Sequence, residues 1–218
     1  MKRLIVFCEG LTEENFVKTV LDPYLSNIDK DMIITPINAG GVSKYSIIKR
    51  DLIRICKGDP TATITTMFDY YGSPKETPGV DTSSGTIYQK VQHIEASVEE
   101  DLKELENLIF NLIMHEYEGL LFTRTSAFEI IANKKQLAAL KEICENKDIE
   151  TPEHINNSYD TAPSKRLEKI IPGYSKKHKV SDGVNIAFRI GIDGISAKCK
   201  HFERWMGKLI DWARDGAQ

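Results

Sequence analysis

Acidic residues follow three short apolar segments of this chain, at the points where buried strands would end. The acids are Glu9 after residues 4–7, Asp69 after residues 62–68, and Glu116 and Glu118 after residues 108–114. In a parallel sheet the carboxyl ends of the strands lie at one edge, so these side chains are expected to converge there. Gathered carboxylates repel one another unless a proton or a cation lies among them. The spacing therefore predicts an acidic site that needs a positive partner.

Carboxylate oxygens are hard ligands, which suit Mg²⁺ or Mn²⁺. A divalent ion can bind a phosphate, orient a water molecule and stabilise charge in an in-line displacement. We predict Glu9 and Asp69 as the first metal ligands, with Glu116 or Glu118 beside them. Glu116 and Glu118 share a face on an extended strand, whereas on a helix only one of them points inward. Glu13, one helical turn after Glu9, is expected to reach the same cavity and to assist Glu9 in catalysis.

A second interpretation of the first segment involves no chemistry. In it, Glu9 is a solvated loop residue and Gly10 is needed only for the turn. Glu13 and Glu14 then serve only to complement the positive end of a helix dipole.

Two lysines lie beside turn residues in the second half of the chain. Lys165 belongs to the segment A-P-S-K-R at 162–166, and Lys176 belongs to P-G-Y-S-K-K at 172–177. A lysine held at a loop can stabilise the negative charge that develops at a scissile phosphate. We predict this catalytic role for Lys165 or Lys176. The alternative is that both belong to a solvated basic surface.

The net charge of −3 hides an asymmetry between two parts of the chain. Residues 95–118 hold eight acids and one base, a sum of −7, whereas residues 163–208 hold eleven lysines and arginines against four acids, a sum of +7. Opposite charge blocks suggest an acidic site and a basic surface that work together. The basic residues, Lys179 among them, could neutralise a nucleic-acid backbone, so nucleic acid is the expected partner. For residues 99–106 a solvated acidic helix face is the favoured interpretation.

Composition and missing motifs exclude several classes of protein. With 41% hydrophobic and 28% charged residues, the chain reads as a soluble globular protein. Its four cysteines form no C-x-x-C pair, so neither a zinc site nor a disulfide framework is indicated. No apolar run approaches ~18 residues and no signal-peptide pattern is present, so we expect a cytoplasmic protein without a membrane partner. A Walker loop, G-x-S-x-G and H-E-x-x-H are also missing, which argues against an ATPase, a serine hydrolase and a zinc peptidase.

Strand and helix patterns alternate through residues 1–122. Strands are predicted at 4–7, 32–38, 62–68 and 108–114, and helices at 12–23, 43–58 and 86–105. Thr12 is expected to cap the first helix and Pro23 to end it. This order calls for an α/β fold, with a parallel sheet, right-handed crossovers and flanking helices.

Residues 123–218 read as a helical, basic elaboration packed on that core, either as a separate region or within one continuous domain. Helices are predicted near 126–132, 134–145, 151–157, 164–170, 182–190 and 198–212.

These residues resemble the Toprim domain shared by topoisomerases, bacterial primases and the overcoming-lysogenization-defect nucleases. That domain has a Glu-Gly pair after its first strand and a D-x-D motif after a later one, and Glu9-Gly10 and Asp69 are similar to these. The segments C-E-G-L-T-E-E-N-F-V, F-D-Y-Y-G, H-E-Y-E-G-L-L-F, A-P-S-K-R-L and H-F-E-R-W resemble a family of small Toprim-like proteins of unknown function, over residues 5–205. The resemblance implies a Rossmannoid sheet, a role in bacterial genome defence and an AAA-type ATPase partner.

Tyr71 stands where the Toprim pattern has its second acid. Either Glu116 or Glu118 replaces that carboxylate, or the site holds one metal ion or is inactive. The expected function is a Mg²⁺- or Mn²⁺-dependent nuclease of a genome-defence complex, active against phages. Two alternatives stay open: a non-catalytic partner or regulator of an ATPase, and a metal-dependent phosphatase of small phosphorylated molecules.

Overall fold

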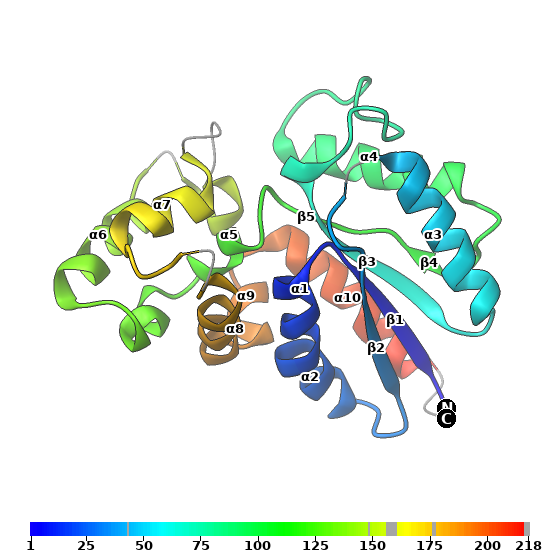
Figure 1. The fold of residues 1–218 in the computed structure, drawn as a ribbon, viewed down its shortest axis with the longest axis horizontal. Coiled ribbons are helices and arrows are strands. Elements are labelled where there is room, and N and C mark those ends of the chain that lie inside the picture. The colour runs from blue at the N-terminus through cyan, green and yellow to red at the C-terminus, as the bar shows by residue number, and fades with distance from the viewer. Residues whose placement is uncertain (43, 148, 156–160, 176–177, 216–218) are drawn as a thin grey trace.

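A parallel five-stranded sheet forms the centre of the computed structural model, which describes residues 1–42, 44–147, 149–155, 161–175 and 178–215. The strand order is β2-β1-β3-β4, and β5 also pairs with β3 (Figure 1). The strands are β1 (Arg3–Cys8), β2 (Ile33–Asn38), β3 (Thr63–Asp69), β4 (Leu108–Ile109) and β5 (Leu112–Ile113). Each strand pair is parallel, which confirms the predicted α/β class.

Helices cover the sheet and form most of the second half of the described chain. The longer ones are α3 (Tyr45–Gly58), α4 (Ile87–Asp101), α6 (Lys134–Cys144), α7 (Pro163–Ile170), α8 (Lys179–Ile190) and α10 (Lys200–Arg214). The shorter ones are α1 (Leu11–Phe16), α2 (Asp22–Ser26), α5 (Glu118–Leu121) and α9 (Ile192–Ser196). Short 3-10 turns are η2 (Tyr70–Gly72), η3 (Thr125–Ile130) and η4 (Pro152–His154), and η1 (Val17–Leu21) is a π-helix.

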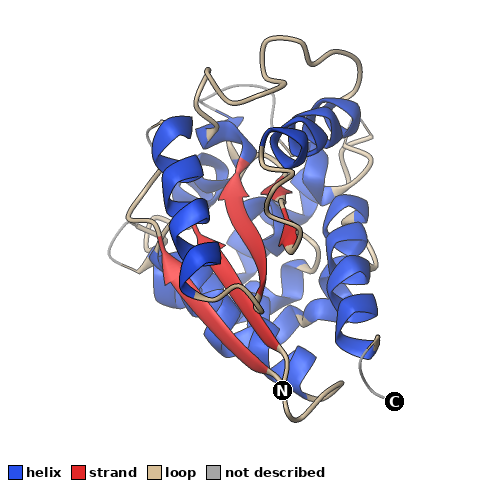
Figure 2. Cartoon of the chain, turned by 90° about the vertical axis from the view of Figure 1, so that its right-hand side faces the viewer, coloured by secondary structure: helices blue, strands red, loops and turns tan. Residues whose placement is uncertain are grey.

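Strand β1 is buried on both faces, as its continuous apolar sequence requires. Leu4 and Val6 point into a core shared with α1, α2 and α8 to α10. Ile5 and Phe7 point into the opposite core, with α3 and α4. Figure 1 shows α3 and α4 on one side of the sheet and α10 passing behind it, and Figure 2 shows the strands enclosed by helices. The C-terminal helices thus complete one face of the core. The division at residue 122 stays a prediction.

The predicted fourth strand, residues 108–114, is wrong as a single element, because β4 and β5 are separated by Phe110 and Asn111. The Thr66 hydroxyl accepts a hydrogen bond from the Asn111 backbone N–H (2.8 Å) and donates one to the Asn111 carbonyl (2.7 Å). Carboxylates of α4 accept hydrogen bonds from the neighbouring backbone N–H groups of Phe110 (3.1 Å) and Leu112 (2.9 Å). Side chains therefore satisfy backbone groups that a continuous strand would have paired with β3.

The first helix also differs from its prediction at both ends. It begins at Leu11 after Gly10, and Thr12 is buried rather than serving as the cap. The chain stays helical through η1 and α2, so Pro23 does not end it. Pro23 lies in the first turn of α2, directly after η1, so its missing N–H falls where the helix changes from the π to the α form.

Two helices predicted in the second half are shorter than expected. The segment 126–132 contains only part of the 3-10 turn η3 (Thr125–Ile130), and the segment 151–157 contains only the turn η4, with residues 156–160 outside the described part. All four cysteines are free thiols. Within the described ranges, no helix is long and apolar enough to cross a membrane.

The break between β4 and β5 generates the first testable prediction. Thr66→Val should lower the free energy of unfolding by about 2–4 kcal/mol, because it leaves two buried backbone groups of Asn111 without partners. Thr66→Ser keeps the hydroxyl and should lose only about 1 kcal/mol for the missing methyl group. Urea denaturation measures both. Equal stability of the two variants would contradict the role given to the hydroxyl.

Candidate functional site

A cavity of about 220 Å³ lies at the carboxyl end of the sheet. Its lining residues come from the ends of β1 and β3, from the segment after β5 and from the start of α7. They are Glu9, Asp69, Tyr71, Gly72, Glu116, Ala162 and Lys165. The structure thus brings together three of the predicted metal ligands and one of the two predicted catalytic lysines. We call this space the acid cavity.

Backbone N–H groups hold each carboxylate of the acid cavity in place. Glu9 Oε2 accepts a hydrogen bond from the backbone N–H of Asp69 (2.9 Å), which links the ends of β1 and β3. Asp69 Oδ1 accepts from the N–H of Tyr117 (3.0 Å), at the start of α5. Glu116 Oε2 accepts from the N–H of Ser164 (3.0 Å), in the first turn of α7. These bonds tie four segments that are distant in sequence to one acidic centre.

The other two predicted acids lie outside the acid cavity. Glu13 is 7% exposed, and its Oε2 accepts a hydrogen bond from the Gly10 N–H (3.0 Å), which closes the turn after β1. Glu118 is fully buried in α5, where its Oε1 accepts from Lys179 Nζ (2.8 Å) and from the Tyr174 hydroxyl (3.2 Å). Its Oε2 is buried and has no hydrogen-bond partner within the described part of the chain. Of the pair Glu116 and Glu118, the structure places only Glu116 at the cavity.

The lysines of the second half of the chain differ in where they lie relative to the acid cavity. Lys165 lines the acid cavity and forms an ion pair with Glu168 one turn later in α7 (3.0 Å). Lys176 lies outside the described residues. Lys179, expected only as part of a basic surface, instead reaches the buried carboxylate of Glu118. No spacing in the sequence indicated that pair, because 61 residues separate its two members and only the fold brings them together.

Burial raises the pKa of the carboxyl groups at this site. The pKa of Asp69 lies well above its usual value, first because of burial and then because of the negative charges of Glu13 and Glu9. Burial also raises the pKa of Glu9, and the negative charge of Glu116 acts in the same direction. The pKa of Glu13 is raised to about 7 by burial and by the charge of Glu9. At neutral pH these groups hold protons or require a cation.

The donor chemistry of the acid cavity fits Mg²⁺ or Mn²⁺, because the oxygens of Glu9, Asp69 and Glu116 come from three separate segments and enter one space. Among the described residues, however, no three Asp, Glu, His or Cys side chains stand in an arrangement that could hold an ion. One oxygen of each carboxylate is turned toward a backbone N–H instead. Binding would therefore require side-chain rotation that exchanges these bonds for metal coordination.

Tyr71 and His115 form an aromatic pair at the rim of the acid cavity. Tyr71 is 44% exposed, and its backbone N–H donates to the His115 carbonyl (3.1 Å). The ring centroids of Tyr71 and His115 are 6.0 Å apart. Burial lowers the pKa of the His115 imidazole to about 4. Neither residue was predicted at the site, since Tyr71 counted only as a missing acid and His115 only as part of an incomplete H-E-x-x-H.

Gly72, which follows Tyr71, lies close to the carboxylate of Glu9. A Cβ atom at this position would lie 3.1 Å from Glu9 Oε1, so a larger residue would press on that carboxylate.

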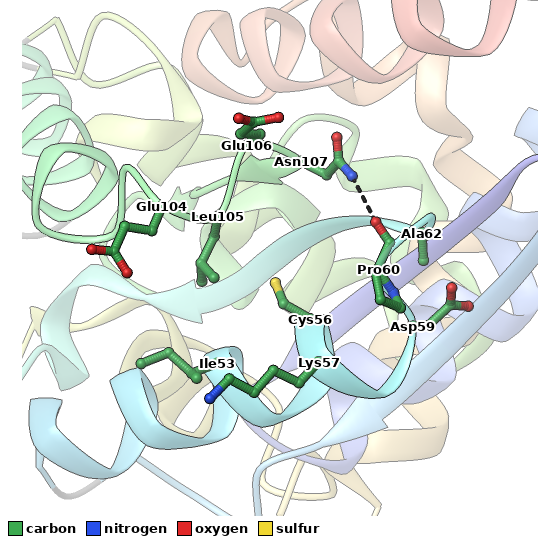
Figure 3. A pocket seen from close by; sticks show the side chains of 10 residues that line it. All are labelled: Ile53, Cys56, Lys57, Asp59, Pro60, Ala62, Glu104, Leu105, Glu106 and Asn107. Atoms are coloured by element: carbon green, nitrogen blue, oxygen red, sulfur yellow. Dashed lines mark hydrogen bonds between the residues drawn. The ribbon is translucent and has the colours of Figure 1, made fainter.

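Two further cavities lie elsewhere in the molecule. One, of about 360 Å³ between α6 and α7, shares Lys165 with the acid cavity and also contains Arg166 and Lys169. Another, of about 490 Å³, lies at the opposite end of the sheet, where β3 and β4 begin (Figure 3). Figure 3 shows Cys56 among its lining side chains and the Asn107 amide bonded to the Pro60 carbonyl (3.1 Å). The cavity at the opposite end of the sheet contains none of the predicted site residues.

A family model described as "Domain of unknown function (DUF4276)" matches residues 8–210. The chain belongs to this family. No curated protein matches it. Among solved structures, it is similar to the C-terminal region of the OLD protein of Xanthomonas campestris pv. campestris, with 13% identity and a TM-score of 0.40. That similarity covers 96% of this chain and 98% of the other. Membership of the Toprim class stays a prediction.

Glu13 and its neighbour Glu14 should have opposite effects on the pH dependence of stability. The folded-state pKa of Glu13 is raised, so the folded protein binds a proton that the unfolded chain releases, and stability falls as pH rises from about 4.5 to 7. Glu13→Gln should therefore stabilise the protein at pH 8 by about 1–3 kcal/mol and have little effect at pH 4.

Glu14 provides the matched control. Its folded-state pKa is lowered, chiefly by its hydrogen bond to Lys18, so its carboxylate stabilises the folded state at neutral pH and that contribution is lost as pH falls. Glu14→Gln should therefore destabilise the protein slightly at pH 8. Urea denaturation across this pH range measures both variants, and a destabilising effect of Glu13→Gln at pH 8 would contradict the assignment.

Proposed function

We propose that this protein is a divalent-metal-dependent phosphodiesterase of the Toprim type that cleaves nucleic acid. The observation that carries the proposal is the acid cavity, which is lined by carboxylates from three segments and by one lysine of α7. Glu9, Asp69 and Glu116 would hold Mg²⁺ or Mn²⁺, with Glu118 as a further acid behind them. The bound ion would supply an electrophilic centre for a phosphate oxygen and an activated water.

The protein's own groups have distinct parts in this proposal. Lys165 stabilises the negative charge that builds up on the phosphate, because it lines the same cavity as the acids. Glu13 supports the position of Glu9 through its bond to Gly10 and can hold a proton near neutral pH. Lys176 remains the second lysine proposed for catalysis.

Nucleic acid is the proposed substrate because cations continue beyond the acid cavity along α7. Arg166 and Lys169 share the neighbouring cavity with Lys165, and they can contact backbone phosphates on either side of the reacting one. An AAA-type ATPase partner and a role in bacterial genome defence complete the proposal, on the resemblance to small Toprim-like proteins. Co-purification with that ATPase tests the partner.

One observation favours a second candidate function, a non-catalytic partner or regulator of an ATPase. Tyr71 occupies the position of an acid in the Toprim pattern, and the carboxylates that are present bind backbone N–H groups. A phosphatase of small phosphorylated molecules is a third candidate, since a cavity of about 220 Å³ accepts a phosphate group. Metal binding separates the first candidate from the second, and salt-dependent binding to nucleic acid separates it from the third.

Calorimetric titration with Mn²⁺ tests the metal site. The wild type should bind Mn²⁺, and Asp69→Asn should bind at least about 10-fold more weakly, because it keeps an oxygen for the Tyr117 N–H but removes the charge. Glu104→Gln, in the cavity at the opposite end of the sheet, should bind like the wild type. Absence of binding to the wild type, in the presence and absence of nucleic acid, would support the regulatory candidate instead.

Cleavage kinetics test the role of Lys165. Lys165→Met should reduce kcat for cleavage of nucleic acid in Mg²⁺ by about 100-fold or more, with an unchanged affinity for Mn²⁺, because the lysine acts on the transition state and not on the metal. Lys169→Met, one helical turn further along α7, should reduce kcat by less than about 5-fold. Equal rates for Lys165→Met and the wild type would overturn this assignment.

A further inference from the structure

Tyr71 is a large apolar side chain at the mouth of an acidic cavity. It belongs to η2, the turn that begins directly after Asp69. It lines the acid cavity together with Glu9 and Lys165. Its exposed fraction, 44%, leaves much of the side chain accessible to solvent. An aromatic face in this position offers a contact that carboxylates and lysines cannot make, since it binds flat π-systems.

The surroundings of Tyr71 hold it in one place. Its backbone N–H donates to the carbonyl of His115, and the imidazole ring lies next to its own ring at 6.0 Å. The ring of Tyr70 also approaches this imidazole edge-on, with 6.3 Å between the ring centroids. Two aromatic rings from η2 therefore contact one histidine from the segment after β5.

His115 provides an independent sign that this arrangement serves a purpose. Its φ of +62° is in the left-handed region, which residues other than glycine seldom adopt. The residue is 8% exposed, and its buried Nδ1 atom has no hydrogen-bond partner among the residues that the structure describes. Backbone strain and an unpaired buried nitrogen both cost stability, and such features persist mainly at functional sites. Here they place the imidazole beside Tyr71.

We propose that Tyr71 stacks on an unpaired base of the strand whose phosphate enters the acid cavity, which makes single-stranded nucleic acid the substrate class. This inference rests on the function proposed above and specifies its substrate. A cavity of about 220 Å³ is smaller than the roughly 300–1,000 Å³ of pockets that enclose a drug-sized ligand, so it takes a phosphate but not a whole nucleotide. The base must then lie at the rim, where Tyr71 is exposed.

Stacking on a side chain requires a base with an accessible face. In a duplex both faces of each base are covered by its neighbours, whereas in a single strand a base can turn outward onto an aromatic ring. Such stacking tolerates any sequence, because every base has a π-face. The strand would then run between Tyr71 and the cations of α7, where Lys165, Arg166 and Lys169 contact its phosphates.

Binding of a short fluorescein-labelled single-stranded oligonucleotide, with Ca²⁺ in place of Mg²⁺ to prevent cleavage, tests this inference by anisotropy. Tyr71→Ala should weaken binding by about 10-fold or more, and Tyr71→Phe should stay within about 2-fold of the wild type. Phe188→Ala is the matched control, because Phe188 is an aromatic residue of α8 that is 62% exposed, and it should bind like the wild type. Thermal unfolding checks that each variant is folded.

Abasic oligonucleotides test the same contact by a change in the nucleic acid instead of the protein. Removing the base that contacts Tyr71 should weaken binding to the wild type and leave binding to Tyr71→Ala unchanged, since the same contact is already lost. A duplex of the same sequence should bind more weakly than the single strand. Equal binding by Tyr71→Ala and the wild type, or a preference for the duplex, would overturn the inference.

The outcomes also separate this inference from the proposed function. If the wild type binds Mn²⁺ and cleaves nucleic acid but Tyr71→Ala is unaffected, only the stacking role and the choice of substrate fail. If the wild type binds neither Mn²⁺ nor nucleic acid, both proposals fail together.

Discussion

Mutual repulsion among buried carboxylates is the constraint on which this end of the molecule depends. Glu9, Asp69 and Glu116 enter one cavity, with Glu13 and Glu118 close enough to raise the pKa of Asp69 further. Burial opposes ionisation of each group, and each charge opposes the next. The backbone N–H groups that bind these carboxylates provide only partial charges. A cluster of this kind costs stability at neutral pH, so a fold that retains it must compensate elsewhere.

The second half of the chain supplies much of that compensation. Lys179, the first residue of α8, places its ammonium group 2.8 Å from the fully buried Glu118 and so neutralises the innermost acid. The first turn of α7 donates the Ser164 N–H to Glu116 and brings Lys165 to the cavity. These helices also complete the apolar core beside β1. The packing that buries the acids therefore delivers the positive groups that balance them.

Much of the sheet could be predicted from the sequence, because each strand was marked by a local apolar run and each site acid by its position after one. The break between β4 and β5 could not, since it depends on Thr66 and on carboxylates of α4. One of these, Glu95, is held by His201 and Arg204 of α10 and accepts the Leu112 N–H (2.9 Å). The segment H-F-E-R-W thus positions β5 from far along the chain. The choice between Glu116 and Glu118 likewise followed from the turn before α5, which no local pattern indicated.

The tyrosine at position 71 follows from the same charge constraint. A carboxylate there would add a further negative charge to a cavity whose existing acids already have raised pKa values. Glu116, from the segment after β5, contributes the third carboxylate that lines the cavity, and η2 contributes none. This leaves position 71 available for an aromatic ring. The strained backbone of His115, one residue before Glu116, then serves two purposes: it turns the chain so that Glu116 enters the cavity, and it sets an imidazole beside Tyr71. An aromatic ring at this position therefore adds no negative charge to the cluster and provides an aromatic contact beside it.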